Sequence, residues 1–350
     1  MKIIDAWDSP VRKSGLISQN EYASLSWAAV SYADFTRTGE YSIVINTYDA
    51  TKAEDGRAAN NGQVLMLDQF GNNLSDQYMV GDRTGCMHPR KSLVADFNND
   101  EMPDVFFACH GDDTIVGGGT GEQSRILISD AVTKKYAVKL VSATDVNGYA
   151  HGGAAADIDG DGNVDVVLAD FKYAGSTLSL RVILGTGTGE FVNDTSRIDL
   201  TKILNKEDVR WENYFSVELI PVSGELYMYA GGGDDLESPD ISAVPNIEAK
   251  FVNGFIDYES VKILPGLKGT VLLDIVRSDS GKLYVIKVPL DYSGMIIQEI
   301  NEDRSRGEIV FTSSGRLHES RHESGIPFFE IIDGKLYGLD LLMDFNLSIQ

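Results

Sequence analysis

The sequence is short of positive charge. It has 30 Lys and Arg residues against 53 Asp and Glu residues, which gives a formal net charge of -23 over 350 residues. Nucleic acids and anionic membrane surfaces attract proteins through clusters of basic residues, so this composition argues against both kinds of partner. An acidic surface that keeps the protein soluble explains the excess of carboxylates. Bound divalent cations, which offset negative charge, are the alternative explanation.

Cysteine and long apolar segments are also scarce. Cys86 and Cys109 are the two cysteines of the chain, which excludes a framework of several disulfides, and no spacing of cysteine and histidine matches a zinc site. We expect two buried, unpaired thiols; a single bridge across a pair of strands is the alternative. Because no run of about 18 apolar residues occurs, we expect no segment that inserts into a membrane.

The N-terminal residues also lack a secretory signal. The stretch MKIIDAWDSPVRKSG has neither the apolar core nor the small-residue cleavage site of a secretory signal. We therefore expect either synthesis without export or the removal of a leader ahead of the numbered chain.

Short apolar segments bounded by glycine, aspartate or asparagine are abundant. Segments such as YSIVINTY, PDVFFACH and VDVVLADF are rich in Val, Ile, Phe and Tyr, and this pattern is typical of an all-β chain. Helical periodicity is confined to 194–211, where one short helix is expected.

The apolar segments recur as a unit in which a turn joins two strands. The clearest copies carry an acidic turn, and the others keep the strands with a worn or lost turn. The copies are 30–48, 93–111, 154–172, 217–233, 271–288 and 327–342. A repeat of this size made of short strands predicts the blades of a β-propeller.

The expected fold is therefore a single all-β domain over residues 1–350. We predict a β-propeller of about six four-stranded blades, or seven if 236–270 holds a further unit. The N-terminal MKIIDAW precedes the first unit. We expect it to add the missing strand of the final blade, because such closure removes exposed strand edges.

The turn of the third unit, DIDGDGNVD, concentrates carboxylates that would repel one another at neutral pH. Its positions 1, 3, 5 and 9 are Asp157, Asp159, Asp161 and Asp165. A hard cation removes the repulsion, and calcium accepts several such oxygen ligands in a flexible geometry. The sequence therefore predicts a calcium site, to which the backbone carbonyl of Asn163 adds a ligand. Leu168 at position 12 and the flanking strands exclude an EF-hand.

The turn of the second unit offers oxygen atoms at the same positions. Its candidate ligands are Asp96, Asn98, Asp100 and Asp104, with the backbone carbonyl of Met102 in the place of that of Asn163. Asn99 and Glu101 replace the glycines of the third unit, and a left-handed glutamate costs roughly 1 kcal/mol. We expect a second and weaker calcium site here. The turn of the first unit, with Asp34, Thr36, Thr38 and Ser42, has lost most of this charge and is expected to bind no metal.

Two stretches resemble a known family. ADIDGDGNVDVVLAD followed by VILGTGTGEF, and HPRKSLVADFNNDEMPDVFFACHG, are similar to the FG-GAP/VCBS repeat of integrin α-subunit propellers and of many bacterial, fungal and phage surface proteins. The resemblance covers a third to half of the chain. It implies a propeller, often seven-bladed, with calcium bound by the two acidic turns named above. Members of the family act as adhesion modules, as lectins and occasionally as lyases or other carbohydrate-active enzymes, so the resemblance does not fix one function.

Histidines mark a candidate ligand site. His88 and His151 stand just before the first strands of the second and third units, and His110 follows the second strand of the second unit. Because the first strand of a blade lines the channel of a propeller, we expect His88, Arg90, His110 and His151 to meet at one mouth of it. The alternative is that these residues are polar loop ends satisfied by backbone groups. The glycine-rich stretches 111–124 and 230–240 are expected to carry binding specificity.

The sequence thus predicts a calcium-stabilised binding or adhesion module that recognises a glycan or protein receptor through loops on one face. No catalytic residue is assigned, because no catalytic motif occurs. The alternatives are a carbohydrate-active enzyme, a lyase or hydrolase with its site at the channel mouth, and a structural module that assembles into a larger complex. We expect the protein outside the cell, at a cell surface or at the surface of a virion, which is assembled without a secretion signal.

Overall fold

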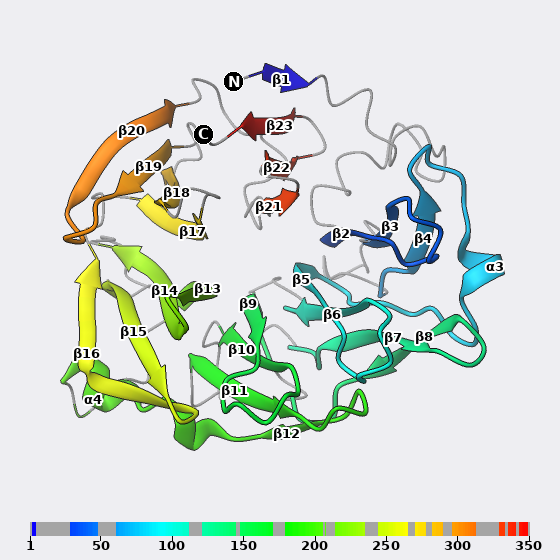
Figure 1. Cartoon of the computed structure of the whole chain (residues 1–350), viewed down its shortest axis with the longest axis horizontal. Helices are drawn as coiled ribbons and strands as arrows, with labels where there is room; N and C mark the ends of the chain where they lie inside the picture. The colour runs from blue at the N-terminus through cyan, green and yellow to red at the C-terminus, as the bar shows by residue number, and fades with distance from the viewer. Residues whose placement is uncertain are drawn as a thin grey trace, which may run out of the picture.

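A computed structural model of the chain is an all-β structure (Figure 1). The structure describes residues 2–4, 29–47, 61–111, 121–144, 148–170, 179–205, 207, 214–234, 244–264, 270–277, 282–289, 296–312, 329–332, 335–340 and 343–348. The short helix expected within 194–211 is present as a 3-10 turn at Thr195–Arg197 followed by α4 (Leu200–Leu204). Another short helix, α3 (Ser75–Tyr78), was not expected. No helix in these ranges has the length and apolar character needed to cross a membrane.

The strands lie in antiparallel sheets arranged in a ring, which is the architecture of a β-propeller (Figure 1). The first sheet contains β2 (Ala29–Ala33), β3 (Ser42–Asn46) and β4 (Val64–Asp68). The second sheet contains β5 (Pro89–Ala95), β6 (Asp104–Cys109), β7 (Arg125–Asp130) and β8 (Lys135–Leu140). The third sheet contains β9 (Ala150–Ala156), β10 (Asp165–Asp170), β11 (Leu180–Gly185) and β12 (Phe191–Asn193).

The fourth sheet is larger and holds the strands of two sequence units. Its strands are β13 (Tyr214–Val222), β14 (Glu225–Asp234), β15 (Asn246–Val252), β16 (Phe255–Leu264), β17 (Thr270–Arg277), β18 (Leu283–Pro289), β19 (Ile296–Ile300) and β20 (Arg306–Thr312). The end of β14 continues beyond its own unit and pairs with the start of β17, at Gly233↔Val271 and Asp234↔Thr270. This pairing joins the two units into one hydrogen-bonded sheet.

The prediction of six or seven separate blades is therefore wrong. The described strands form five hydrogen-bonded sheets, of which one is eight-stranded and one three-stranded. The described residues of 236–270 form no separate seventh unit, because β15 and β16 complete the sheet that begins with β13 and β14.

The ring closes as the sequence indicates. The fifth sheet contains β21 (Phe329–Ile332), β22 (Lys335–Asp340), β23 (Met343–Ser348) and the N-terminal strand β1 (Lys2–Ile4). Strand β1 pairs antiparallel with β23 in the register Lys2↔Asn346, Ile3↔Phe345 and Ile4↔Asp344. Both ends of the chain thus contribute to one sheet, which lies between the strands of the first unit and those of the fifth (Figure 1).

The core lies between neighbouring sheets and follows from strand periodicity. Every residue of β6 is buried, and its side chains alternate between two cores. Val105 and Phe107 pack with the first sheet, against residues such as Val44, whereas Phe106 packs with the third sheet, against residues such as Val166. A strand with two buried faces requires an almost continuous apolar segment, which is what PDVFFACH provides.

The first strands of the units lie nearest the centre of the ring (Figure 1). Their packing is close: a Cβ added to Gly152 of β9 would lie 2.9 Å from both the carbonyl oxygen of Phe215 and the Cα of Ser216 in β13. A side chain also reaches past β9, since Lys91 Nζ of β5 lies 3.1 Å from Glu218 Oε1 of β13. The described inner strands therefore pack directly against one another.

Strand direction divides the propeller into two ends. Strand β5 begins opposite Cys109 and ends opposite Asp104, and β9 begins opposite Asp170 and ends opposite Asp165. The acidic turns consequently lie at one end of the sheets, which we call the acidic-loop end, and the histidines lie at the other, which we call the histidine end. A seven-residue strand separates the two ends by about 20 Å. The connections between the second and third strands start at the histidine end, although 112–120, 171–178 and 235–243 fall outside the described residues.

Candidate functional site

The acidic loop of the third unit brings three carboxylates together. Oxygen atoms of Asp157, Asp159 and Asp165 all lie within 4.8 Å of one another. The Asp157 carboxylate accepts hydrogen bonds from the backbone N–H groups of Gly160, at 2.7 Å, and Gly162, at 3.0 Å. Both glycines have positive φ, 80° and 87°, a conformation that glycine adopts without steric cost. The turn thus holds the carboxylates close together even though they repel one another.

Asp165 is the buried member of this group, with 1% of its surface exposed. Its carboxylate accepts hydrogen bonds from the N–H groups of Ile158 and Gly185, each at 2.8 Å. Burial raises the pKa of Asp165 to about 6, and the negative charges of Asp159 and Asp161 add to the rise. A positive ion in the loop would favour the ionised form of this carboxylate.

Asp161 is a predicted ligand that lies apart from the convergent group. The Asp161 carboxylate accepts hydrogen bonds from the backbone and side-chain N–H groups of Asn163, both at 2.8 Å. Asp161 is exposed and is not part of the convergent group. The loop therefore offers three of its four aspartates to a common point.

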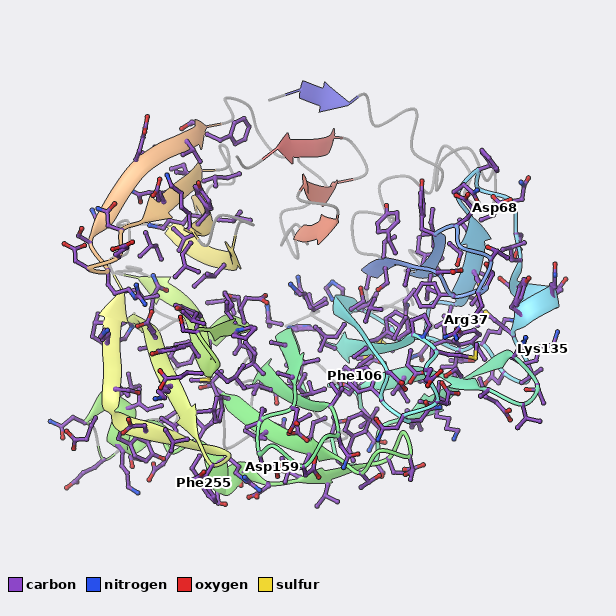
Figure 2. The ribbon with its side chains drawn as sticks, viewed as in Figure 1. Arg37, Asp68, Phe106, Lys135, Asp159 and Phe255 are labelled. Atoms are coloured by element: carbon purple, nitrogen blue, oxygen red, sulfur yellow. A yellow bond between two sulfur atoms is a disulfide. The ribbon has the colours of Figure 1, made fainter. Side chains whose placement is uncertain are left out.

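Arg197 contacts the same loop and was not identified from the sequence. Its Nη2 donates to Asp159 Oδ2 at 3.2 Å and its Nε to Asp194 at 2.8 Å. The guanidinium also lies 4.6 Å from the ring centroid of Phe255, and Figure 2 shows Phe255 close to Asp159. The other oxygen, Asp159 Oδ1, is buried and has no hydrogen-bond partner within the described ranges. Arg197 thus offsets part of the loop's charge and leaves one carboxylate oxygen available to a cation.

The acidic loop of the second unit repeats this construction with a different partner. Asp104 is fully buried and accepts hydrogen bonds from the N–H groups of Phe97, at 2.9 Å, and Ser129, at 2.7 Å. The Ser129 hydroxyl also lies 2.6 Å from Asp104 Oδ1 and 3.0 Å from both oxygens of Asp100. Burial raises the pKa of Asp104 to about 6, and the Asp100 charge adds to the rise. Ser129 was not identified from the sequence.

The other predicted ligands of this loop make hydrogen bonds that stabilise its turn. Asp96 accepts hydrogen bonds from the N–H groups of Asp100 and Glu101, at 3.0 and 2.8 Å, and Asn98 Nδ2 donates to the Ser129 carbonyl at 2.9 Å. Met102 donates its N–H to Asp100 at 2.9 Å. The carboxylates of Asp96, Asp100 and Asp104 do not form a convergent group like that of the third unit.

The two loops share their backbone conformation despite different residues. Asn99 and Glu101 have φ values of 57° and 65°, at the positions that Gly160 and Gly162 occupy in the third unit. The first-unit turn is built alike: Asp34 accepts hydrogen bonds from Thr38, at 2.9 Å, and Gly39, at 2.8 Å. Its ninth residue is Ser42, whose hydroxyl accepts from Phe35 at 3.1 Å. The first turn therefore keeps the shape without the carboxylates that a cation needs.

At the opposite end, the structure brings the three candidate histidines together. The ring centroids of His88 and His110 are 5.3 Å apart, and those of His110 and His151 are 4.3 Å apart. Tyr149 and Phe215 extend the cluster, at 5.2 Å from His110 and 5.3 Å from His151. The three histidines are buried, and their ligand nitrogens are not among the convergent metal-type groups of the described residues. Arg90, also buried, follows His88 by two residues on β5.

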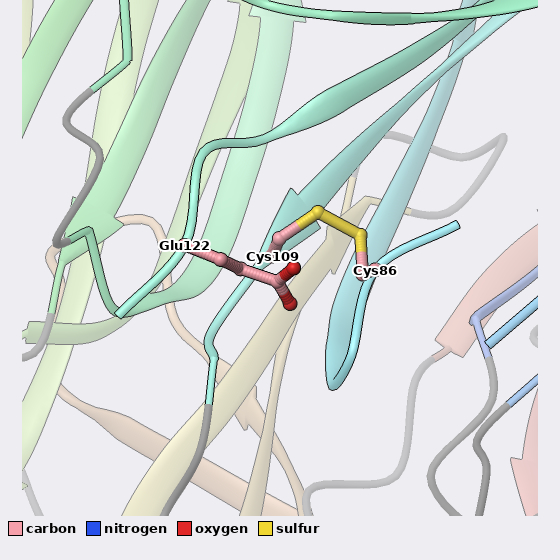
Figure 3. Close-up of side chains that lie close together, drawn as sticks. All are labelled: Cys86, Cys109 and Glu122. Atoms are coloured by element: carbon pink, nitrogen blue, oxygen red, sulfur yellow. A yellow bond between two sulfur atoms is a disulfide. The ribbon is translucent and has the colours of Figure 1, made fainter. Parts of the chain in front are cut away.

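A disulfide lies beside this cluster, where unpaired thiols were expected. Cys86 and Cys109 are bonded, with their Cα atoms 5.4 Å apart (Figure 3). The expectation of two buried thiols was wrong because Cys109 ends β6 opposite the start of β5, and the chain entering β5 carries Cys86 to the same point. The alternative of one bridge across a strand pair describes the structure.

Glu122 organises the same region and was not identified from the sequence. Its Oε1 accepts hydrogen bonds from the N–H groups of Met87, at 2.7 Å, His88, at 3.1 Å, and Gly111, at 3.3 Å. Its Oε2 accepts from Asn61 Nδ2 at 3.0 Å. Figure 3 shows its carboxylate next to the disulfide, and burial raises its pKa. One carboxylate thus fixes the backbone on both sides of the histidine pair.

Replacing Glu122 tests this role. Glu122→Ala is expected to lower the free energy of unfolding by about 2–4 kcal/mol, because it removes the acceptor for several buried N–H groups. Glu122→Gln, which keeps an acceptor oxygen of the same reach, should cost less than half as much. Urea unfolding of both variants measures the difference. Equal losses would mean that the charge, and not the hydrogen bonding, is what matters.

Among known proteins, similarity to this chain is found with solved structures. No family model and no curated protein matches the sequence. Similar solved structures include YCF48 bound to D1 peptide, with 7% identity, 92% of this chain and 77% of that chain covered, and a TM-score of 0.45. A putative 6-phosphogluconolactonase from Bacteroides uniformis has 13% identity, with 89% and 88% covered and a TM-score of 0.45. A glucose dehydrogenase has 14% identity, with 93% and 98% covered and a TM-score of 0.44. At this level of similarity no function passes to this chain, which is placed among the β-propellers by its own strand topology.

Proposed function

We propose that this protein is a calcium-stabilised binding module of the FG-GAP/VCBS type. The observation that carries the proposal is the convergence of Asp157, Asp159 and Asp165 within 4.8 Å. Three like charges at this separation repel one another strongly unless a cation lies between them. Their oxygen atoms suit calcium, which takes carboxylate and carbonyl ligands. The second-unit loop, with Asp96, Asn98, Asp100, Asp104 and the carbonyl of Met102, is proposed as the weaker site.

The calcium ions would stabilise the fold and would not contact the bound ligand. The acidic-loop end is separated from the histidine end by the length of β5 and β9, about 20 Å. An ion in either loop would tie the first two strands of its blade together. An ion in the third-unit loop would also fix its blade against the next one, because Arg197 donates both to Asp159 and to the carbonyl of Gly254, in the turn between β15 and β16.

The ligand site is proposed at the histidine end. His88, His110 and His151 are gathered there with Arg90, and the connections between second and third strands start from the same end. Loops held by a rigid scaffold commonly carry binding residues. A guanidinium and titratable imidazoles suit an anionic group, so an acidic glycan or an acidic protein surface is the proposed ligand.

An extracellular location, at a cell or virion surface, belongs to the same proposal. The Cys86–Cys109 bond supports it, because structural disulfides persist mainly in oxidising environments. The second candidate function is a lyase or hydrolase acting on an acidic polysaccharide. The observation favouring it is the buried histidine cluster, in which His110 contacts His88, His151 and Tyr149, since such groups serve as acids and bases in catalysis.

Two measurements test the proposal. Calorimetric titration with calcium is expected to show saturable binding, and a glycan array is expected to show retention of carboxylate-bearing glycans. His151→Gln should abolish retention without loss of calcium binding, while Thr36→Ala, at the opposite end, should change neither. Absence of calcium binding would refute the metal part. Turnover of an acidic polysaccharide by the wild type, lost in His151→Gln, would favour the enzyme.

A further inference from the structure

One hydrogen bond joins the two acidic loops directly. Asn99 Nδ2, in the second-unit loop, donates to Asn163 Oδ1, in the third-unit loop, at 2.8 Å. The two residues are 64 positions apart in the chain and belong to neighbouring blades. Neither side chain is a candidate ligand: for Asn163 only the backbone carbonyl was assigned that role.

Each asparagine is connected to the carboxylates of its own loop. Asn163 donates two hydrogen bonds to Asp161, both at 2.8 Å. Asn99 immediately precedes Asp100, whose N–H donates to Asp96 at 3.0 Å. A rearrangement of either loop around an ion therefore moves one end of the Asn99–Asn163 bond.

A neighbouring turn holds this bond in place. A Cβ added to Gly187, in the turn between β11 and β12, would lie 2.2 Å from Asn163 Oδ1 and 2.6 Å from Asn99 Nδ2. The N–H of Gly189, in the same turn, donates to the Phe97 carbonyl at 3.1 Å. The turn of the third blade thus covers the loop of the second blade and leaves the two amides little room to separate.

We infer that the acidic loops of the second and third units are energetically coupled through Asn99 and Asn163, so that calcium in one loop raises the affinity of the other for calcium. The inference rests on the proposed calcium binding. An ion that orders one loop fixes its asparagine, and the second loop then loses less conformational freedom when it binds. Asn99 and Asn163 are positioning residues in this scheme. One neutral hydrogen bond implies a coupling of about 3- to 10-fold in affinity.

The test is calcium titration by calorimetry of the wild type and of Asn99→Gly. Glycine accepts the left-handed backbone of Asn99 and removes only the amide. The matched control is Asn205→Gly, the same change at an exposed residue with φ of 50° that caps α4. We expect positive cooperativity in the wild type and in the control. In Asn99→Gly we expect two independent sites, with the binding of the second ion weakened about 3- to 10-fold.

The outcomes separate the inference from the function on which it rests. Two independent sites in the wild type, a single bound ion, or unchanged cooperativity in Asn99→Gly would each overturn the coupling and leave calcium binding intact. No bound ion in the wild type would overturn both. Circular dichroism of each variant confirms that the strands are retained, so that a loss of cooperativity is not a loss of fold.

Discussion

Chelation of calcium is expected to lower the free energy of unfolding by about 5 kcal/mol. An ion that binds only the folded protein stabilises it by roughly 2.7 kcal/mol at a free concentration 100-fold above its dissociation constant, and two loops are proposed to bind. The physical reason is that Asp157, Asp159 and Asp165 lie within 4.8 Å of one another, so the native state without an ion retains their mutual repulsion. Thermal or urea unfolding in EDTA and in calcium measures the difference.

Substitutions at the third position of two turns show which loop provides the stabilisation by calcium. Asp159→Asn should remove about half of the calcium-dependent gain, because it takes the negative charge from one of the three convergent side chains. Thr36→Ala, at the same position of the uncharged first turn, should leave the gain unchanged and alter stability by less than about 0.5 kcal/mol. Identical unfolding in EDTA and calcium would disprove a structural role for calcium in both loops.

In the absence of calcium, stability should fall as the pH rises from about 4 to about 7. Burial raises the pKa of Asp104 and of Asp165 from the ordinary 3.8 to about 6. Well below pH 3.8 both groups are protonated in the folded and the unfolded state. Between pH 3.8 and pH 6 the folded state holds protons that the unfolded chain has released. The stability that these protons contribute is lost once the pH passes 6. A shift of this size corresponds to about 3 kcal/mol for each group.

Calcium should reverse this trend, because an ion bound to a carboxylate competes with its proton. The gain from calcium is therefore expected to be larger at pH 7 than at pH 5. Urea unfolding in EDTA between pH 4.5 and 7.5, compared between wild type and Asp165→Asn, isolates one group from the other carboxylates that titrate. The difference in stability between the two proteins should change by about 2 kcal/mol across this range, because part of the full effect already falls below pH 4.5. A constant difference would show that Asp165 ionises as it does in the unfolded chain.

The repeated strands and the acidic turns could be predicted from the sequence because they depend on local pattern. Alternating apolar residues in PDVFFACH place Phe106 and Phe107 on opposite faces of β6, and both faces are buried. The spacing of aspartates and glycines in DIDGDGNVD fixes a turn that gathers Asp157, Asp159 and Asp165. The pairing of β1 with the last blade could be predicted because the apolar N-terminal segment precedes the first unit and has no strand partner there. The meeting of His88, His110 and His151 followed from their positions at strand ends.

Tertiary structure alone decided the features that join distant parts of the chain. The fusion of two units into one sheet depends on the register in which β14 meets β17, and no local pattern specifies that register. The Cys86–Cys109 bond depends on how the chain enters β5. Arg197, Ser129 and Glu122 reach the loops and the histidines across 38, 25 and 34 residues of sequence. A sequence pattern reports the period of a single element, whereas these contacts depend on how separate elements pack in three dimensions.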